Sequence, residues 1–351
     1  MRKGLLLLSL LLASVAFSGA GRADDKSAQR FAILPDGVRF PEGIIANPAT
    51  RDIFVATFDF GPNANKLLRF SKNGQLTAQR DFGATPLLGL EFRSGNVYIA
   101  NFGAGQIQRI PASFSAGTAI EVVADIPKIG APIARHEGNP DGSQDLTTFG
   151  SNSVPAPNGL VFDKAGNLYV SDSFQGAIFR VNNATTCAPC SVTTISHDPL
   201  LATAGFPPFG ANGLALSSDE NTLFVANTGD DRVLVVNVST GIATVFAESI
   251  NGADGLVFDD QRRLWVAANQ NDEIVALNAK ARVTARVGEF DGINRDGTPE
   301  GLLFPASMVI LGDDMFVTNV ALPLTPAVGD EPEEDVTRWT ISRIKLPKPD
   351  K

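Results

Sequence analysis

Four residues with oxygen-bearing side chains stand at one point of a repeated sequence phrase. Glu42 lies in FPEGI, Asn158 in APNGL, Asn212 in GANGL and Asp254 in GADGL. The set offers two carboxylates and two amide oxygens, and it contains neither cysteine nor histidine. Calcium takes about six to eight oxygen ligands in proteins, whereas zinc and copper favour nitrogen and sulfur. If the fold brings these side chains to one point, we expect one calcium ion there.

A simpler explanation exists for each pair taken alone, because Asn-Gly and Asp-Gly are common turn dipeptides. A turn does not, however, require the Glu-Gly of the first copy. In the two remaining copies, Leu88 of PLLGL and Ser307 of FPASM are placed at the same register. Ser307 is therefore an accessory position, either a further ligand or a polar plug.

The phrase belongs to a longer repeat of short apolar strands. Six strands that end in small polar residues recur along the chain: DIFVATF 52–58, NVYIANF 96–102, NLYVSDS 167–173, TLFVANT 222–228, RLWVAAN 263–269 and DMFVTNV 314–320. Each has an apolar strand before it and another after it, and five units add a fourth strand. This pattern predicts an all-β fold, a six-bladed β-propeller with four-stranded blades.

Closure of the ring is expected to involve the start of the folded chain. The sixth unit lacks its fourth strand, and RFAILP at 30–35 has no partner of its own, so we predict that it completes that blade and hides two sheet edges. Residues 24–351 are then a single domain. The long connections at 126–157, 196–211 and 320–337 all fall on one face, as binding loops do.

The N-terminus and the two cysteines suggest an exported protein. Residues 1–23 combine a basic start, a run of 14 mostly apolar residues and small residues, which predicts a signal peptide cleaved after Ala20 or Ala23. We therefore expect a periplasmic or secreted protein with no membrane span. Cys187 and Cys190 are expected to form a local disulfide, in preference to a redox pair or a zinc site.

Charge narrows the range of partners. The chain has 29 basic and 38 acidic residues, for a formal net charge of −9, and removal of residues 1–23 would take away basic residues only. An acidic balance argues against nucleic acid and anionic membranes and is compatible with cation binding. The sequence does not indicate an oligomeric state.

The four residues and their order carry a family resemblance. Glu in an "EG" pair of the first blade, then Asn-Gly-Leu twice and Asp-Gly, resembles the senescence-marker-protein, gluconolactonase and luciferin-regenerating-enzyme superfamily of calcium-dependent six-bladed propellers. The same order is similar to that of the phosphotriesterase-type and paraoxonase-type propellers. The resemblance extends over about residues 30–346. The chain departs from the sugar lactonases after "EG", where it continues as IIANP.

That resemblance implies a calcium-dependent hydrolase of the lactonase or esterase type, with a small lactone or ester as substrate. One axial Ca²⁺ would be held by Glu42, Asn158, Asn212 and Asp254, and it would polarise the carbonyl oxygen. Asp254 would act as base or nucleophile, and Glu42 as a ligand only. His136 and His197 are candidate proton shuttles in long loops, although histidines in loops are more often plain surface residues.

A competing function comes from another class of protein. NHL-repeat-like propellers resemble these units and bind proteins or glycans without catalysis, and a cation could survive in such a scaffold as a structural plug. A quinone-dependent dehydrogenase is disfavoured because the expected channel is acidic. The two main hypotheses differ in whether a pocket remains open above the four oxygen donors.

Overall fold

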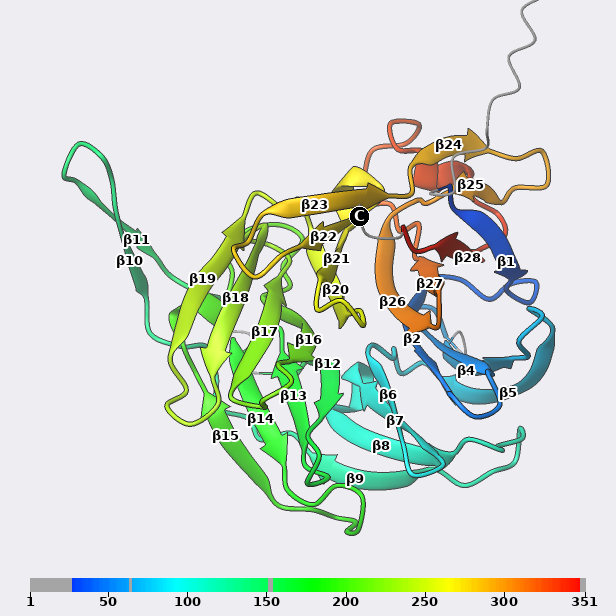
Figure 1. Cartoon of the computed structure of the whole chain (residues 1–351), viewed down its shortest axis with the longest axis horizontal. Coiled ribbons are helices and arrows are strands. Elements are labelled where there is room, and N and C mark those ends of the chain that lie inside the picture. The colour runs from blue at the N-terminus through cyan, green and yellow to red at the C-terminus, as the bar shows by residue number, and fades with distance from the viewer. Residues whose placement is uncertain (1–26, 63–64, 151–153, 348–351) are drawn as a thin grey trace, which may run out of the picture.

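The computed structural model describes residues 27–62, 65–150 and 154–347, and its sheets form a ring of blades around a central channel (Figure 1). Blade one consists of β2 (Pro41–Ala46), β3 (Ile53–Thr57), β4 (Asn65–Phe70) and β5 (Leu76–Gly83). Blade two consists of β6 (Leu90–Arg93), β7 (Asn96–Asn101), β8 (Gln106–Pro111) and β9 (Glu121–Asp125). Blade three consists of β12 (Pro157–Phe162), β13 (Leu168–Asp172), β14 (Ala177–Val181) and β15 (Val192–Ser196).

The remaining blades continue the same order. Blade four consists of β16 (Ala211–Leu216), β17 (Thr222–Asn227), β18 (Arg232–Asn237) and β19 (Ala243–Glu248). Blade five consists of β20 (Ala253–Phe258), β21 (Leu264–Ala268), β22 (Glu273–Leu277) and β23 (Val283–Val287). Every blade is antiparallel, and the predicted six-bladed all-β propeller is confirmed.

The sixth blade joins the two ends of the described chain. Its order is β26 (Pro305–Leu311), β27 (Asp314–Asn319), β28 (Thr340–Lys345) and β1 (Gln29–Ile33), with Gln29 opposite Arg343 and Ile33 opposite Thr340. The N-terminal strand therefore supplies the missing edge as predicted, and pairing removes two exposed strand edges. The predicted signal peptide lies outside the described residues.

Continuous apolar runs form the inner strands because both faces of a blade are covered by its neighbours. All five residues of β3 are buried, as are all five of β13 and of β21. Between blades one and two the core contains Phe54, Leu67, Val97 and Phe114. Strands buried on both faces do not need the alternation of polar and apolar residues that a half-exposed strand shows.

Two hairpins decorate the ring. β10 (Arg135–Gly138) and β11 (Gln144–Thr147) pair and project outward from it (Figure 1), and β24 (Phe290–Ile293) pairs with β25 (Pro299–Gly301). At the base of the projecting hairpin, the buried Arg135 guanidinium lies 2.9 Å from Asp230 and 2.8 Å from Glu137. These ion pairs tie the arm to blade four.

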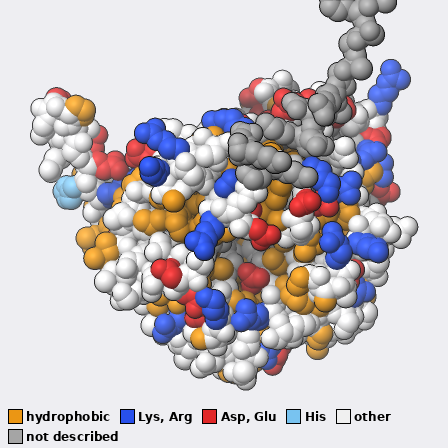
Figure 2. Space-filling model, in the orientation of Figure 1, with side chains coloured by type: hydrophobic (Ala, Val, Ile, Leu, Met, Phe, Trp, Pro, Cys, Tyr) orange, Lys and Arg blue, Asp and Glu red, His pale blue; other side chains and the backbone are white. Residues whose placement is uncertain are grey.

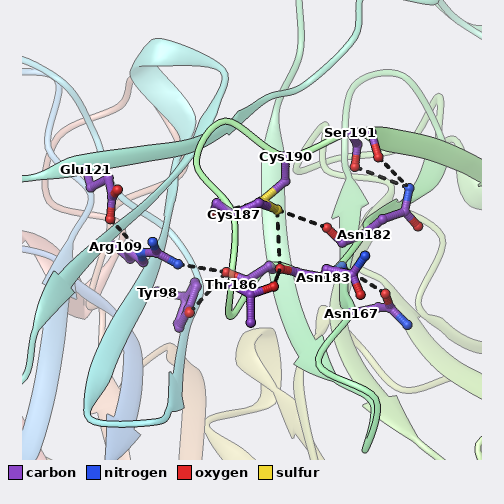
Figure 3. The surroundings of a disulfide bond; sticks show 11 residues. Tyr98, Arg109, Glu121, Asn167, Asn182, Asn183, Thr186, Cys187, Cys190 and Ser191 are labelled. Atoms are coloured by element: carbon purple, nitrogen blue, oxygen red, sulfur yellow. Dashed lines mark hydrogen bonds and ion pairs between the residues drawn. A yellow bond between two sulfur atoms is a disulfide. The ribbon is translucent and has the colours of Figure 1, made fainter.

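The predicted disulfide joins Cys187 and Cys190 in the turn between β14 and β15. Figure 3 shows how this turn meets blade two: Arg109 and Tyr98 both donate hydrogen bonds to the carbonyl oxygen of Ala184. The Cys190 N–H also donates to the Val123 carbonyl at 2.7 Å. The disulfide therefore closes a local turn that packs between two blades. Within the described residues, no helix is long and apolar enough to cross a membrane.

Candidate functional site

In five of the six blades, a β-bulge at the start of the first strand aims one side chain into the channel, and Leu88 stands at the same register of blade two. In blade one, Pro41 pairs with Thr57 and Ile44 with Val55, so the first strand carries one extra residue. Register shifts at the corresponding positions occur in blades three, four, five and six. A bulge turns the strand and re-aims a side chain. We call the re-aimed position the head residue: Glu42, Leu88, Asn158, Asn212, Asp254 and Ala306.

Glycine follows the head residue in five blades because the next blade comes very close there. A Cβ on Gly159 would collide with the carbonyl oxygen of Asn212, and one on Gly213 with that of Asp254. The same relation joins Gly43 to Leu88, Gly89 to Asn158 and Gly255 to Ala306. The Asn-Gly and Asp-Gly pairs are thus close contacts between blades, and the turn explanation for them is wrong.

The four predicted ligands line one cavity of about 60 Å³ at the channel. Glu42, Asn158, Asn212 and Asp254 are all buried. The structure therefore brings together every residue of the predicted calcium set, and it does so at one end of the ring.

Neighbouring side chains orient the amides and one carboxylate. Asn158 donates a side-chain N–H to Ser173 Oγ at 3.0 Å, and Asn212 donates one to Thr228 Oγ1 at 2.9 Å. These bonds hold both amides at the wall of the cavity. Asn269 donates to Asp254 Oδ2 at 3.0 Å, and Asp254 Oδ1 is buried without a hydrogen-bond partner among the described residues.

Glu42 is held differently from the other three. Its Oε2 is buried without a hydrogen-bond partner among the described residues. Its backbone carbonyl accepts a hydrogen bond from Thr318 Oγ1 at 2.7 Å, which fixes the main chain but leaves the carboxylate free. A buried carboxylate oxygen without a donor costs free energy unless a proton or a cation compensates it.

The electrostatics of the cavity favour a positive charge. Burial raises the pKa of Glu42 well above its usual range, and the negative charge of Asp254 raises it further. Burial also raises the pKa of Asp254, to about 7, against the opposing effect of the Asn269 and Asn212 amides. No Lys, Arg or His is among the described residues that line the cavity. A cation would reverse both shifts by favouring the ionised carboxylates.

This donor set fits a hard cation. Two carboxylates and two amides held by hydrogen bonds line one cavity, and one oxygen of each carboxylate has no hydrogen-bond partner among the described residues. Oxygen donors of this kind suit calcium better than zinc or copper. The four side chains would leave further coordination positions for water or substrate.

Apolar side chains make up the rest of the cavity wall. Phe58 continues β3, Phe304 precedes β26, and Leu322 and Leu324 lie in the connection from β27 to β28. Phe209 comes from the connection between β15 and β16. Two of the three long connections therefore reach the cavity, whereas no described residue of 126–156 lines it.

The accessory residues do not join this group. Ser307 lines a separate cavity of about 240 Å³ in the channel, together with Glu91 and Met308, while Ala306 occupies the head position. Pairing of Pro305 with Asn319 and of Met308 with Val317 sets this register. The expectation that Ser307 stands with the four ligands is wrong by one residue, because blade six has no glycine to mark the bulge.

Both histidines also lie elsewhere. His136 is exposed in the projecting hairpin opposite Leu146. His197 is exposed, and its Nε2 lies 3.1 Å from the Gly130 carbonyl oxygen. Neither lines the cavity of the four ligands, so the structure does not place them as proton shuttles.

Sequence reasoning pointed to Asn269 as a polar residue at a strand end on this face, but it missed Ser173 and Thr228, which orient the two amides. Ser173, Thr228 and Asn269 follow the second strands of blades three to five. The sequence pattern that marks them is a polar residue one position after the second strand, in a repeat whose head residue is also polar. On the face seen in Figure 2, acidic and basic side chains are interspersed around the ring, so surface charge gives no comparable signal.

A family model describes part of this site. The SMP-30/gluconolactonase/LRE-like region matches residues 156–288, which span blades three, four and five. That match confirms the superfamily resemblance. It includes three of the four ligands, and Glu42 lies outside it.

Several solved structures share the fold of this chain. A luciferin-regenerating enzyme matches with a TM-score of 0.61 at 14% identity, covering 88% of this chain and 92% of its own. Regucalcin from Agrobacterium tumefaciens, described as a calcium-binding protein, matches with a TM-score of 0.57 at 15% identity, covering 90% of this chain and 96% of its own. A putative gluconolactonase matches with a TM-score of 0.56 at 15% identity, covering 92% of this chain and 94% of its own. These likenesses show the fold. No curated protein matches the sequence significantly.

Proposed function

We propose that this protein is an exported, calcium-dependent hydrolase of the lactonase or esterase type. One observation carries the proposal: within the part of the chain that the structure describes, Glu42 Oε2 and Asp254 Oδ1 are buried without hydrogen-bond partners in one cavity that two oriented amides share. The matched family takes its name in part from gluconolactonase, and one structural neighbour is described as calcium-binding, which supports the reaction class and the ion.

The four residues at the cavity would have different roles in this reaction. When bound, calcium would polarise the substrate carbonyl and stabilise the negative charge that develops on its oxygen. Asp254 is held at Oδ2 by Asn269, and its free Oδ1 can accept a proton from water or attack the carbonyl carbon. Glu42 supplies negative charge, and Asn158 and Asn212 supply neutral oxygens.

The rival is a non-catalytic propeller that binds an exported protein or glycan partner and keeps the cation as a plug. One observation favours it: neither histidine lines the cavity, so Asp254 and Glu42 are its only titratable groups among the described residues. A plug would bind calcium as tightly as an enzyme would. The two functions therefore differ in turnover and not in metal content.

Hydrolysis of a panel of neutral lactones and aryl esters by the calcium-loaded protein tests the proposal. We expect Asp254→Asn to lower kcat by about 10²–10⁴-fold, the usual contribution of a positioned base or nucleophile. Asp260→Asn, an exposed carboxylate of the same blade, is the matched control and should retain full activity. Calcium binding without turnover of any lactone or ester would favour the binding propeller.

A further inference from the structure

The geometry points to the kind of molecule that this site accepts. Resting on the proposed function, we infer that the ligand is a neutral carbonyl compound with an apolar chain or ring beside the carbonyl, and not a polyhydroxylated sugar lactone. The carbonyl oxygen would face the cation site, and the apolar part would lie against Phe58, Phe304 and Leu324.

The wall of the cavity offers carbon surface to such a ligand. Phe58 lies edge-on to Phe209, with ring centroids 6.0 Å apart, and both rings line the cavity. Leu322 and Leu324 extend the apolar wall on the side of blade six. Apolar contact is stabilised in proportion to the area removed from water, so this wall favours alkyl or aryl groups.

The polar groups of the cavity are partly committed to one another. One N–H each of Asn158 and Asn212 goes to Ser173 and Thr228, and one N–H of Asn269 goes to Asp254. The Thr228 hydroxyl donates to the Ala253 carbonyl at 2.8 Å. The apolar wall offers no hydrogen-bond partner, so a polyol that loses its water against it would leave hydroxyl groups unpaired, which is costly.

Charge sets a further limit. The lining contains no cationic side chain among the described residues, so the carboxylate of an anionic ligand would have no cationic protein partner.

Exposed aromatic side chains continue the apolar wall toward the protein surface. Phe60 is 71% exposed and packs edge-on against Phe58, with centroids 4.9 Å apart. Phe206, in the connection that supplies Phe209, is 60% exposed. Exposed aromatic rings that continue a buried apolar wall are typical of a binding surface for apolar groups.

Calorimetric binding of alkyl-substituted cyclic ketones to the calcium-loaded protein tests this inference without turnover. Ketones of this type present a carbonyl but cannot be hydrolysed. We expect affinity to rise by up to about fourfold for each methylene that enters the apolar wall. A polyhydroxylated cyclohexanone, which also cannot be hydrolysed, should bind more weakly than the unsubstituted ketone. A flat series, or tighter binding of the polyhydroxylated ketone, would overturn the inference.

A pair of variants in one connection locates the effect. Leu324→Gln makes the half-buried wall polar at similar size, and it should weaken binding of the long-chain ketone about tenfold while leaving calcium affinity unchanged. Val328→Gln changes an exposed residue of the same connection and should alter neither quantity. Equal ketone affinity in both variants and the wild type would contradict the placement of the ketone chain against this wall. If Leu324→Gln does not fold, the chain-length series on the wild type still decides the question.

Failure of the inference can be separated from failure of the proposed function. Calcium-dependent hydrolysis that prefers sugar lactones would leave the hydrolase standing and overturn the apolar ligand class. Chain-length-dependent ketone binding without hydrolysis of any ester would support the ligand class and overturn the hydrolase.

Discussion

Blades three to five and blades six, one and two meet at the same cavity but offer it opposite chemistry. In the first half, every head residue is polar and has a polar partner after the second strand: Asn158 with Ser173, Asn212 with Thr228 and Asp254 with Asn269. In the second half, two head residues are Leu88 and Ala306, and the positions after the second strands in blades one and six are Phe58 and Val320. We call these the polar half and the apolar half.

The difference separates two tasks within one ring. The polar half fixes oxygen atoms before any ligand arrives, and it is also the region that the family model matches. The apolar half contributes a single charged group, Glu42, whose Oε2 lacks a partner among the described residues. We infer that the polar half sets the cation chemistry and that the apolar half sets which organic group can approach it.

The largest effect is expected where a glycine lies against the next blade. Gly213→Ala would place a Cβ against the Asp254 carbonyl and should lower the free energy of unfolding by about 3 kcal/mol. Ser307→Ala changes the equivalent position of blade six, in the apolar half, where a side chain is already accommodated, and should cost less than about 1 kcal/mol. Urea unfolding of both variants measures this, and equal losses would contradict the close contact at Gly213.

A second prediction concerns the pH dependence of the metal-free protein. Because the folded-state pKa of Asp254 is raised to about 7, the folded form holds its proton more tightly than the unfolded chain does. Stability without metal should therefore be full below the unfolded pKa, near 4, and should fall by a few kcal/mol as pH rises to about 7. Melting in the presence of chelator across this range measures the loss.

Two comparisons sharpen that result. Asp254→Asn should flatten much of the pH dependence in chelator, because the titrating carboxylate with the raised pKa is gone. Saturating calcium should reverse the trend for the wild type, since protons compete with the cation for Glu42 and Asp254 as pH falls. A metal-free protein whose stability rises between about pH 4 and about pH 7 would contradict the pKa assignment.

The smallest effect is expected from the residues that orient ligands. Thr228→Val removes the acceptor of the Asn212 amide and the donor to Ala253, and should cost about 1–2 kcal/mol of stability and weaken calcium binding. Val320→Thr makes the reverse change in the apolar half, next to a head residue with no polar atom. It should leave calcium affinity unchanged. Calcium titration by calorimetry distinguishes the two.

The repeat predicted most of the fold and the core of the site. Strand boundaries, the six blades and closure by residues 30–35 follow from apolar runs that recur with a shared ending. The head position could be predicted wherever a glycine followed it, because the next blade leaves no room for a Cβ at that glycine. At Ser307 no glycine anchors the register, and the prediction slipped by one residue.

Features outside the repeat could not be predicted in this way. His136 lies in a hairpin outside the blade repeat and His197 in an irregular connection, so nothing in the repeat fixes where their side chains point. The apolar wall depends on Phe209, Leu322 and Leu324, which reach the cavity through loop conformations that have no sequence period. Assignment of residues 24–351 to a single domain, the signal peptide before it and the roles of the four ligands remain predictions.

Calcium content of the purified protein, paired with melting curves with and without chelator, tests the central claim most directly. We predict about one calcium per chain and a melting temperature lowered by about 5 °C on chelation, as expected for an ion present at about a hundred times its dissociation constant. Glu42→Gln should lose most of that stabilisation. A protein that contains no calcium and melts identically in chelator would contradict the account of the axial site.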